Sequence, residues 1–181
     1  MHHQKSLLVL PAFEKKLLRA VIETPKGSRN KYDYNPGLGC FEFGKALPEG
    51  MNFPFDFGFV PSTLGDDGDP VDILVLMDAP AQMGVVVKAK LLGGIKAEQK
   101  EKGGDWLRND RLIAVAEKSR LYEKPKALAD LREGLVQEIA DFFVHYNELD
   151  GKEFRTLGVC GARGARTLIE RGMKKFKKKM R

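Results

Sequence analysis

Between residues 20 and 116 the chain is divided into short apolar runs, and this division constrains the fold more than any other feature. Each run holds four to eight residues rich in Val, Ile, Phe or Tyr, and Gly, Pro or Asn closes it. Such runs are typical of β-strands joined by tight turns, and a series of them favours a small barrel or sandwich of antiparallel strands. We therefore expect strands over residues 20–23, 31–34, 40–43, 57–60, 71–77, 85–92 and 112–116.

Two amphipathic patterns follow near the end of the chain. Apolar side chains recur at spacings of three, four and seven between residues 126 and 146, which predicts a helix that packs on the core. A second apolar stripe over residues 165–176 predicts another helix, after a strand-like segment at 156–160. Residues 1–19 are expected to form an N-terminal arm, compatible with a short helix from Pro11 to Arg19. Since 181 residues match one domain and no linker divides them, we expect a single domain over residues 1–181.

The positive charge of the chain is concentrated at its C-terminal end. Lys and Arg number 31 against 25 Asp and Glu, and six of the positive charges fall in residues 174–181, which hold no acid. The remainder of the chain is therefore neutral. Such a run is usually a solvated helix end or a frayed terminus, so we expect a basic tail outside the functional site, whose deletion leaves the activity nearly unchanged. Nucleic acid is not an expected partner.

The cysteines and the apolar runs bear on the cellular compartment. Cys40 and Cys160 lie far apart and neither belongs to a Cys-x-x-Cys pair, which favours free thiols in a reducing compartment. The longest early apolar stretch, residues 6–13, is too short to cross a membrane and runs directly into charged residues. We expect a cytoplasmic protein with no membrane partner.

Four aspartates fall within residues 66–72 (DDGDPVD), the most chemically distinctive segment. Pro70 excludes a helix and Gly68 permits a sharp turn, so we expect a loop that leads into the strand at 71–77. Carboxylates at this density raise one another's pKa unless a cation lies among them, and oxygen ligands favour Mg²⁺ or Mn²⁺ over zinc. Asp72 is expected to share a strand face with the leucines two and four positions further on. The alternative reading is a solvated Asp-Gly turn.

Cations near the ends of the predicted strands complement these acids. Lys31, Lys45, Arg108 and Arg111 each lie near acidic residues, although each one taken singly is more typical of a solvated surface. Cations and metal ligands together suit an anionic substrate, as phosphoryl transfer requires. The sequence holds no Walker A loop, no Gly-x-Gly-x-x-Gly and no Gly-x-Ser-x-Gly, which disfavours P-loop, dinucleotide and serine-hydrolase chemistry.

Residues 67–73 (DGDPVDI) resemble the signature of the soluble family I inorganic pyrophosphatases. Other segments resemble that family in the right order: residues 21–25 (VIETP), 31–33 (KYD), 53–59 (FPFDFGF), 112–115 (LIAV) and 142–146 (FFVHY). The resemblance spans about residues 20–150. It implies an α+β, mainly β fold: a five-stranded Greek-key barrel of the oligonucleotide-binding (OB) type with flanking C-terminal helices. It also implies Mg²⁺-dependent hydrolysis of pyrophosphate to two phosphates by a homo-oligomer, usually a hexamer in bacteria.

The resemblance further implies roles for individual residues. Asp69 resembles the catalytic group that takes a proton from the attacking water. Asp67 and Asp72 resemble metal ligands, and Glu23 resembles an outer metal-binding residue. Residues that resemble substrate contacts are Lys31, Asp33, Lys45, Arg111 and Tyr146. Gln99 and Asn109 fall where the family has carboxylates, so their acidic neighbours, Glu98 and Asp110, are the candidates for further metal ligands.

The sequence also departs from the family pattern. Phe53 and Phe57 stand where Tyr is common, Lys45 replaces an Arg, Asn147 replaces a Lys and Arg111 replaces a Lys. These changes leave open an activity on another phosphoanhydride. A non-catalytic barrel that binds nucleotides or nucleic acid is a further alternative, but the aspartate cluster disfavours it because carboxylates repel polyanions.

Overall fold

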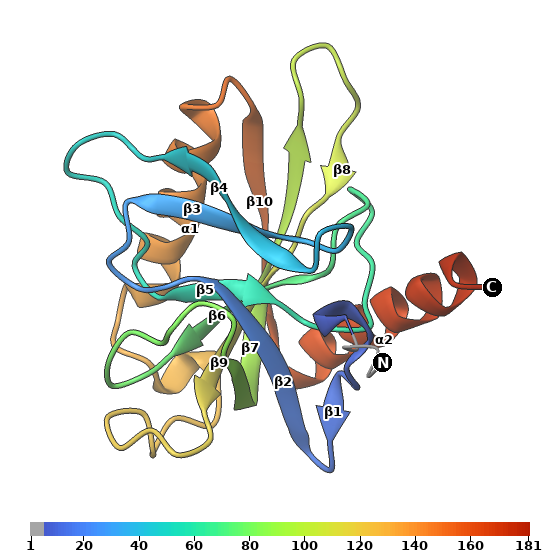
Figure 1. The fold of residues 1–181 in the computed structure, drawn as a ribbon. Helices are drawn as coiled ribbons and strands as arrows, with labels where there is room; N and C mark the ends of the chain where they lie inside the picture. Colours follow the sequence, from blue (N-terminus) through green and yellow to red (C-terminus); the bar gives the residue numbers. More distant parts are fainter. Residues whose placement is uncertain (1–5) are drawn as a thin grey trace.

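The computed structural model describes residues 6–181, and its main sheet closes on itself to form a barrel (Figure 1). The ring consists, in order of pairing, of β2 (Leu17–Thr24), β5 (Asp56–Phe59), β6 (Asp72–Leu76), β9 (Arg111–Ala116) and β7 (Val86–Lys100), which pairs back with β2. The predicted mainly β, five-stranded barrel is confirmed. One expectation about it is wrong, because β6 and β9 run parallel and the other pairs of the ring are antiparallel.

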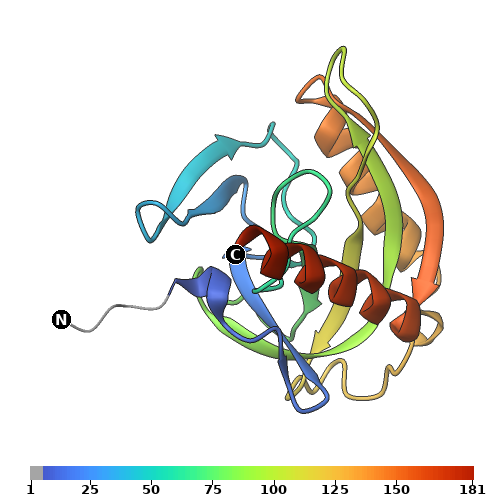
Figure 2. The same cartoon turned by 90° about the vertical axis from the view of Figure 1, so that its right-hand side faces the viewer.

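Further strands and two helices extend this ring. Strand β1 (Phe13–Glu14) pairs with β2, while β8 (Leu107–Arg108) and β10 (Glu153–Gly161) pair with β7. Strands β3 (Asn30–Asn35) and β4 (Cys40–Ala46) form a separate hairpin sheet. Helix α1 (Leu135–Glu148) lies beside β10, and α2 (Ala162–Lys179) crosses the outside of the sheet (Figure 2). Two 3-10 turns complete the structure, η1 (Leu7–Val9) and η2 (Leu128–Asp130).

Two apolar clusters pack on the opposite faces of the strands. Leu74 and Leu76 of β6 belong to the cluster that α1 covers, whereas Ile73 and Val75 belong to the cluster that α2 covers. This alternation is the two-residue period of a strand that is buried on both faces. Asp72, at the start of β6, shares the α1 face with the two leucines, as predicted.

The N-terminal segment differs from the expected helix. Over the described part of residues 1–19, Phe13–Glu14 and Leu17–Thr24 form a β-hairpin, with Lys15 at a φ of 56° in the turn. Leu18 is 1% exposed and pairs with Ala89 of β7. The helix prediction over Pro11–Arg19 is therefore wrong, because pairing with a distant strand overrides a weak local pattern.

The helix predicted between residues 126 and 146 starts later than expected. Gly134 has a φ of 80° and precedes α1, and a 3-10 turn, η2, occupies the beginning of the pattern. Leu131 is nevertheless buried, so the apolar stripe marks the core even where the chain is not helical. The second predicted helix is confirmed by α2, whose last turns include most of the basic segment 174–181. No helix within residues 6–181 has both the length and the apolar character needed to cross a membrane.

A single glycine permits the close approach of β2 and β5. A Cβ atom on Gly58 would lie 1.9 Å from the carbonyl oxygen of Val21, which no side-chain movement relieves. We predict that Gly58→Ala lowers the free energy of unfolding by more than about 3 kcal/mol, measured by urea denaturation. The control is Gly161→Ala, because no atom lies within 4 Å of a Cβ there; it should change stability by less than about 1 kcal/mol. Equal losses at both positions would contradict this account of the strand packing.

Candidate functional site

A cavity of about 880 Å³ opens among the barrel strands, the β3–β4 hairpin and both helices. Eight of the residues singled out from the sequence line it: Glu23, Lys31, Asp33, Asp67, Asp69, Asp72, Arg111 and Tyr146. They come from β2, β3, the loop before β6, β6 itself, β9 and α1. The closed barrel therefore brings residues that are distant in sequence to the walls of one cavity.

The segment of residues 65–72, here called the acidic loop, is folded by its own backbone. The Gly65 N–H donates to the carbonyl of Asp69 (2.6 Å), and the Asp69 N–H donates to Oδ1 of Asp67 (3.2 Å). Gly68, at the bend between them, has a φ of 95°, which glycine adopts without strain. The loop thus turns Asp67 and Asp69 toward the same cavity as Asp72.

Burial makes the negative charges of this cavity costly. Burial, together with the neighbouring charge of Asp72, raises the pKa of Asp67 to about 6. Burial also raises the pKa of Asp72, against the opposing effect of Arg111. The pKa of Glu23 rises to about 7 by burial, although Lys31 opposes the shift. Positive charge placed beside these buried carboxyl groups stabilises their ionised form.

Part of that charge comes from the chain itself. Arg111 is 4% exposed, and its Nη1 lies 2.6 Å from Oδ2 of Asp72. The Arg111 guanidinium also lies over the ring of Phe143, 4.7 Å from the ring centroid. Lys31 donates to Asp33, and its Nζ lies 3.8 Å from Oε2 of Glu23. Two of the three predicted substrate-binding cations therefore pair with acids of the same cavity.

Glu98 does not occupy the position predicted for a metal ligand. Side chains alternate along β7, so Gln99 lines the cavity, whereas Glu98 points to the other face and accepts from Nη2 of Arg155 at 2.8 Å. The same alternation brings Glu101, two residues beyond Gln99, to the cavity wall. The strand thus presents an amide where a carboxylate was expected.

Asp110 likewise lies outside the large cavity. Its Oδ1 accepts from the N–H of Ala97 (3.0 Å) and from Nη2 of Arg108 (2.5 Å), so it ties the β8–β9 connection to β7. Its neighbour Asn109 faces the cavity and donates from Nδ2 to Oε1 of Gln99 (3.0 Å). Glu98 and Asp110, which were predicted as further metal ligands, thus lie outside the large cavity that holds Asp67 and Asp72.

The aromatic side of the cavity contains Tyr146 of α1. Its pKa is raised by burial and by the nearby charge of Asp150, so the hydroxyl stays protonated and can donate a hydrogen bond. Lys45 does not line the cavity itself; its ammonium pairs with Asp150 and lies 3.9 Å from the centroid of the Tyr146 ring. Phe53 and Phe57 line the wall beside Tyr146 and also belong to the buried core.

Several cavity residues were missed by the sequence reading. Lys152 pairs with Glu101 (2.6 Å), and the two face the cavity together with Asn147 and Asp150. Residues from the end of α2 also line it: Phe176, Lys179 and Met180. The position of Glu101 could have been found from its two-residue spacing to Gln99, but the contribution of α2 depends on how the helix packs.

The donors in the cavity fit a divalent cation on chemical grounds. Within residues 6–181 no three His, Cys, Asp or Glu side chains converge as a metal-binding group. The carboxylates of Asp67 and Asp72 are nevertheless close enough to raise the pKa of Asp67, and both are oxygen ligands of the kind that hard divalent ions prefer. These two side chains, with Glu23 behind them, are the residues that would hold such an ion.

The fold and the cavity define a barrel protein whose main cavity is lined by paired acids and cations. The family follows from comparison with known proteins. Residues 20–177 match the family model described as inorganic pyrophosphatase, and the chain therefore belongs to the inorganic pyrophosphatase family.

Individual relatives agree with this assignment. The chain is 38% identical to the inorganic pyrophosphatase of Thermus thermophilus, over 91% of this chain and 93% of that protein. It is 36% identical to the corresponding protein of Synechocystis, over 89% and 92%. Among solved structures, the T. thermophilus enzyme superposes with a TM-score of 0.86 at 34% identity, covering 96% of this chain and 99% of that one. The Coxiella burnetii structure superposes with a TM-score of 0.82 at 32% identity, over 92% and 99%.

The raised pKa of Glu23 predicts a pH-dependent stability for the protein treated with EDTA. A carboxyl whose pKa rises from 4.5 to about 7 on folding binds its proton more tightly when folded. The free energy of unfolding should therefore fall as the pH increases from about 5 to 8. Glu23→Gln should reduce this slope and stabilise the protein at pH 8 by about 2 kcal/mol. Urea denaturation at several pH values measures it, with the exposed Glu133→Gln as control; a slope unchanged by Glu23→Gln would contradict the assignment.

Proposed function

We propose that this protein hydrolyses pyrophosphate to two phosphates and that Mg²⁺ is its divalent cation, with Mn²⁺ as an alternative. The observation that carries the proposal is that the acidic loop, Lys31, Arg111 and Tyr146 line one cavity. Membership in the pyrophosphatase family supports it independently. A binding module for nucleic acid has no comparable support, since the cavity holds more acidic than basic side chains.

The aspartates of the acidic loop have different roles in the proposed reaction. Asp67 and Asp72 would hold the divalent cation, which when bound neutralises substrate charge and lowers the pKa of water. Asp69 lies at the exposed end of the loop, and its backbone is fixed by hydrogen bonds to Gly65 and Asp67. Its carboxylate therefore faces the cavity from a defined position and accepts the proton of the attacking water.

The cations and the tyrosine bind the phosphate groups. Arg111 and Lys31 pair with Asp72 and Asp33, respectively. Phosphate oxygens of the substrate would replace these carboxylates as partners of the Arg111 guanidinium and the Lys31 ammonium. The Tyr146 hydroxyl donates a hydrogen bond to the same anion and stabilises charge that develops on the departing phosphate.

A second candidate substrate is a longer phosphoanhydride. The cavity of about 880 Å³ is larger than pyrophosphate requires. The rings of Phe53 and Phe57, which line it, carry no hydroxyl that could donate a hydrogen bond to a phosphate. Comparison of pyrophosphate with tripolyphosphate as substrates distinguishes the two candidates.

The wider setting of the enzyme is proposed from its family. We propose that residues 1–181 act as one domain in the cytoplasm and assemble into a homo-oligomer, a hexamer by family resemblance. Size-exclusion chromatography with light scattering tests the assembly.

Phosphate release from pyrophosphate tests the reaction directly. With Mg²⁺ present, the protein should release phosphate, and EDTA should abolish the release. Asp69→Asn should lower the rate at least about 100-fold, because it removes the proton acceptor while the loop backbone is unchanged. The control is Asp105→Asn, at an exposed position outside the cavity, which should retain the rate. Release that survives both EDTA and Asp69→Asn would contradict the mechanism.

A further inference from the structure

The end of helix α2 forms part of the cavity that holds the predicted catalytic groups. Phe176, Lys179 and Met180 line it, although the sequence suggested a basic tail outside the site. Figure 2 shows α2 crossing the outside of the sheet toward its C-terminal end. Residues 174–181 were expected to lie outside the site, so their place on the cavity wall gives a reason to test whether they contribute to it.

Close packing fixes α2 against the chain that leads into the acidic loop. The Leu64 N–H donates to the carbonyl of Gly172 at 3.1 Å. A Cβ on Gly172 would lie 3.0 Å from Cγ2 of Val71 and 3.1 Å from Cβ of Thr63, so a larger residue here would have to displace these neighbours slightly. Phe176 and Lys179 follow Gly172 on the same helical face, at spacings of four and three residues. The packed face of α2 therefore continues into the cavity.

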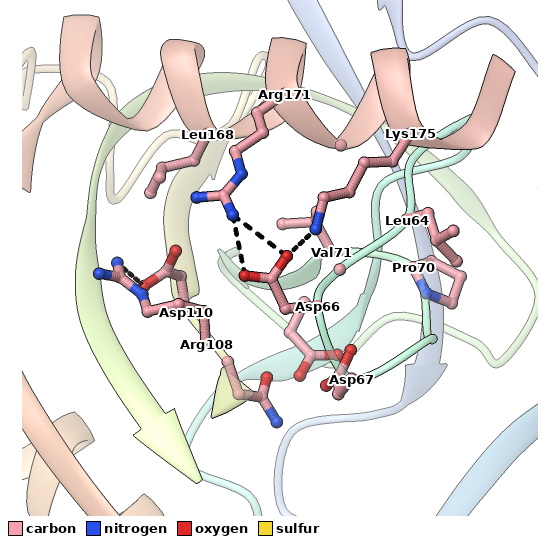
Figure 3. Close-up of a pocket in the computed structure, with 14 residues that line it drawn as sticks. Leu64, Asp66, Asp67, Pro70, Val71, Arg108, Asp110, Leu168, Arg171 and Lys175 are labelled. Atoms are coloured by element: carbon pink, nitrogen blue, oxygen red, sulfur yellow. Dashed lines mark hydrogen bonds and ion pairs between the residues drawn. The ribbon is translucent and has the colours of Figure 1, made fainter. Parts of the chain in front are cut away.

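Ion pairs strengthen the same junction. Around a smaller cavity of about 40 Å³, Asp66 of the acidic loop pairs with Arg171 (3.0 Å) and with Lys175 (Figure 3). Both cations come from α2, on the two sides of Gly172. The helix and the acidic loop are thus joined by backbone contact and by charge, which holds the end of α2 in a defined place relative to Asp67 and Asp69.

The charge balance of the large cavity distinguishes Lys179 from the other cations. Lys31, Arg111 and Lys152 each form an ion pair with an acid that also lines the cavity. Within residues 6–181, Lys179 forms no ion pair. It is thus the cation of the cavity whose charge is not already compensated by a neighbouring carboxylate.

We propose that Lys179 is a substrate-binding residue whose ammonium contacts a phosphate oxygen of the anion in the cavity. The inference rests on the proposed function and extends it, because it assigns a role to a helix end that the sequence reading placed outside the site. Favourable interaction with the helix dipole explains why lysines gather in the last turn of α2, at positions 177–179. It does not explain why the side chain of Lys179, rather than that of Lys178, faces the cavity.

Adjacent lysines provide the matched test. Lys179→Ala should raise the dissociation constant of methylenediphosphonate, a non-hydrolysable analogue of pyrophosphate, about fivefold in isothermal titration calorimetry with Mg²⁺. It should raise KM for pyrophosphate by a similar factor and leave kcat within about twofold, because Lys179 binds the anion and does not move its protons. Lys178→Ala removes the same charge one residue away and should change both constants less than twofold. Lys179→Arg should recover most of the lost affinity.

The outcomes separate the two proposals. Equal affinities in Lys179→Ala and Lys178→Ala, with wild-type protein that binds and hydrolyses, overturn the role of Lys179 and leave the proposed function intact. Wild-type protein that neither binds the analogue nor hydrolyses pyrophosphate overturns both. An effect on affinity confined to Lys179→Ala, with rescue by arginine, supports the inference.

Discussion

The crowding of carboxylates in the acidic loop is the constraint on which the rest of the site depends. Asp67 and Asp72 face the same cavity, and their proximity raises the pKa of Asp67 in addition to the effect of burial. A folded chain accepts such a cost only where the surrounding structure holds the groups in place. Here the bend at Gly68, strand β6 and helix α2 all contribute to that restraint. The loop is therefore preorganised for positive charge.

The barrel determines how that charge is supplied. Asp72 starts β6 and Arg111 starts β9, and these residues are register partners in the parallel pair. Their ion pair at 2.6 Å thus follows from the topology of the ring. Lys31 reaches Glu23 of β2 from the separate β3–β4 hairpin, whose strand β3 contacts β2. These contacts compensate part of the negative charge. They also keep the cations close to the place where an anionic substrate would bind.

The sequence predicts the barrel well because turn formers and short β-rich runs are local signals that agree with the tertiary structure. It predicts the face of Asp72 for the same reason, since strand alternation is a local property. It fails over Pro11–Arg19, where pairing of Leu18 with Ala89 decides the conformation. Local patterns therefore describe the strands of the barrel. The β1–β2 hairpin depends instead on pairing with β7, where the partner of Leu18 lies 71 residues away in the sequence.

Prediction from local sequence patterns also reaches a limit at the functional site, at the level of single side chains. Gln99 faces the cavity and Glu98 does not, because a shift of one residue on a strand moves a side chain to the opposite face. Asn109 faces the cavity and Asp110 does not, although both lie in the connection between β8 and β9. The sequence alone does not determine which of two adjacent residues in these segments faces the cavity. The contribution of Lys179 was hidden for a different reason, since a basic helix end is usually solvated and only its packing on the acidic loop reveals a role.

The central claim is that the acidic loop holds a divalent cation between the carboxylates of Asp67 and Asp72. Anomalous diffraction from crystals soaked in Mn²⁺ tests it most directly, because the metal is located without reference to activity. The account predicts an anomalous peak within bonding distance, roughly 2.0–2.6 Å, of oxygens from both residues. A map with no peak at the loop, and with Asp72 still paired to Arg111, would contradict it.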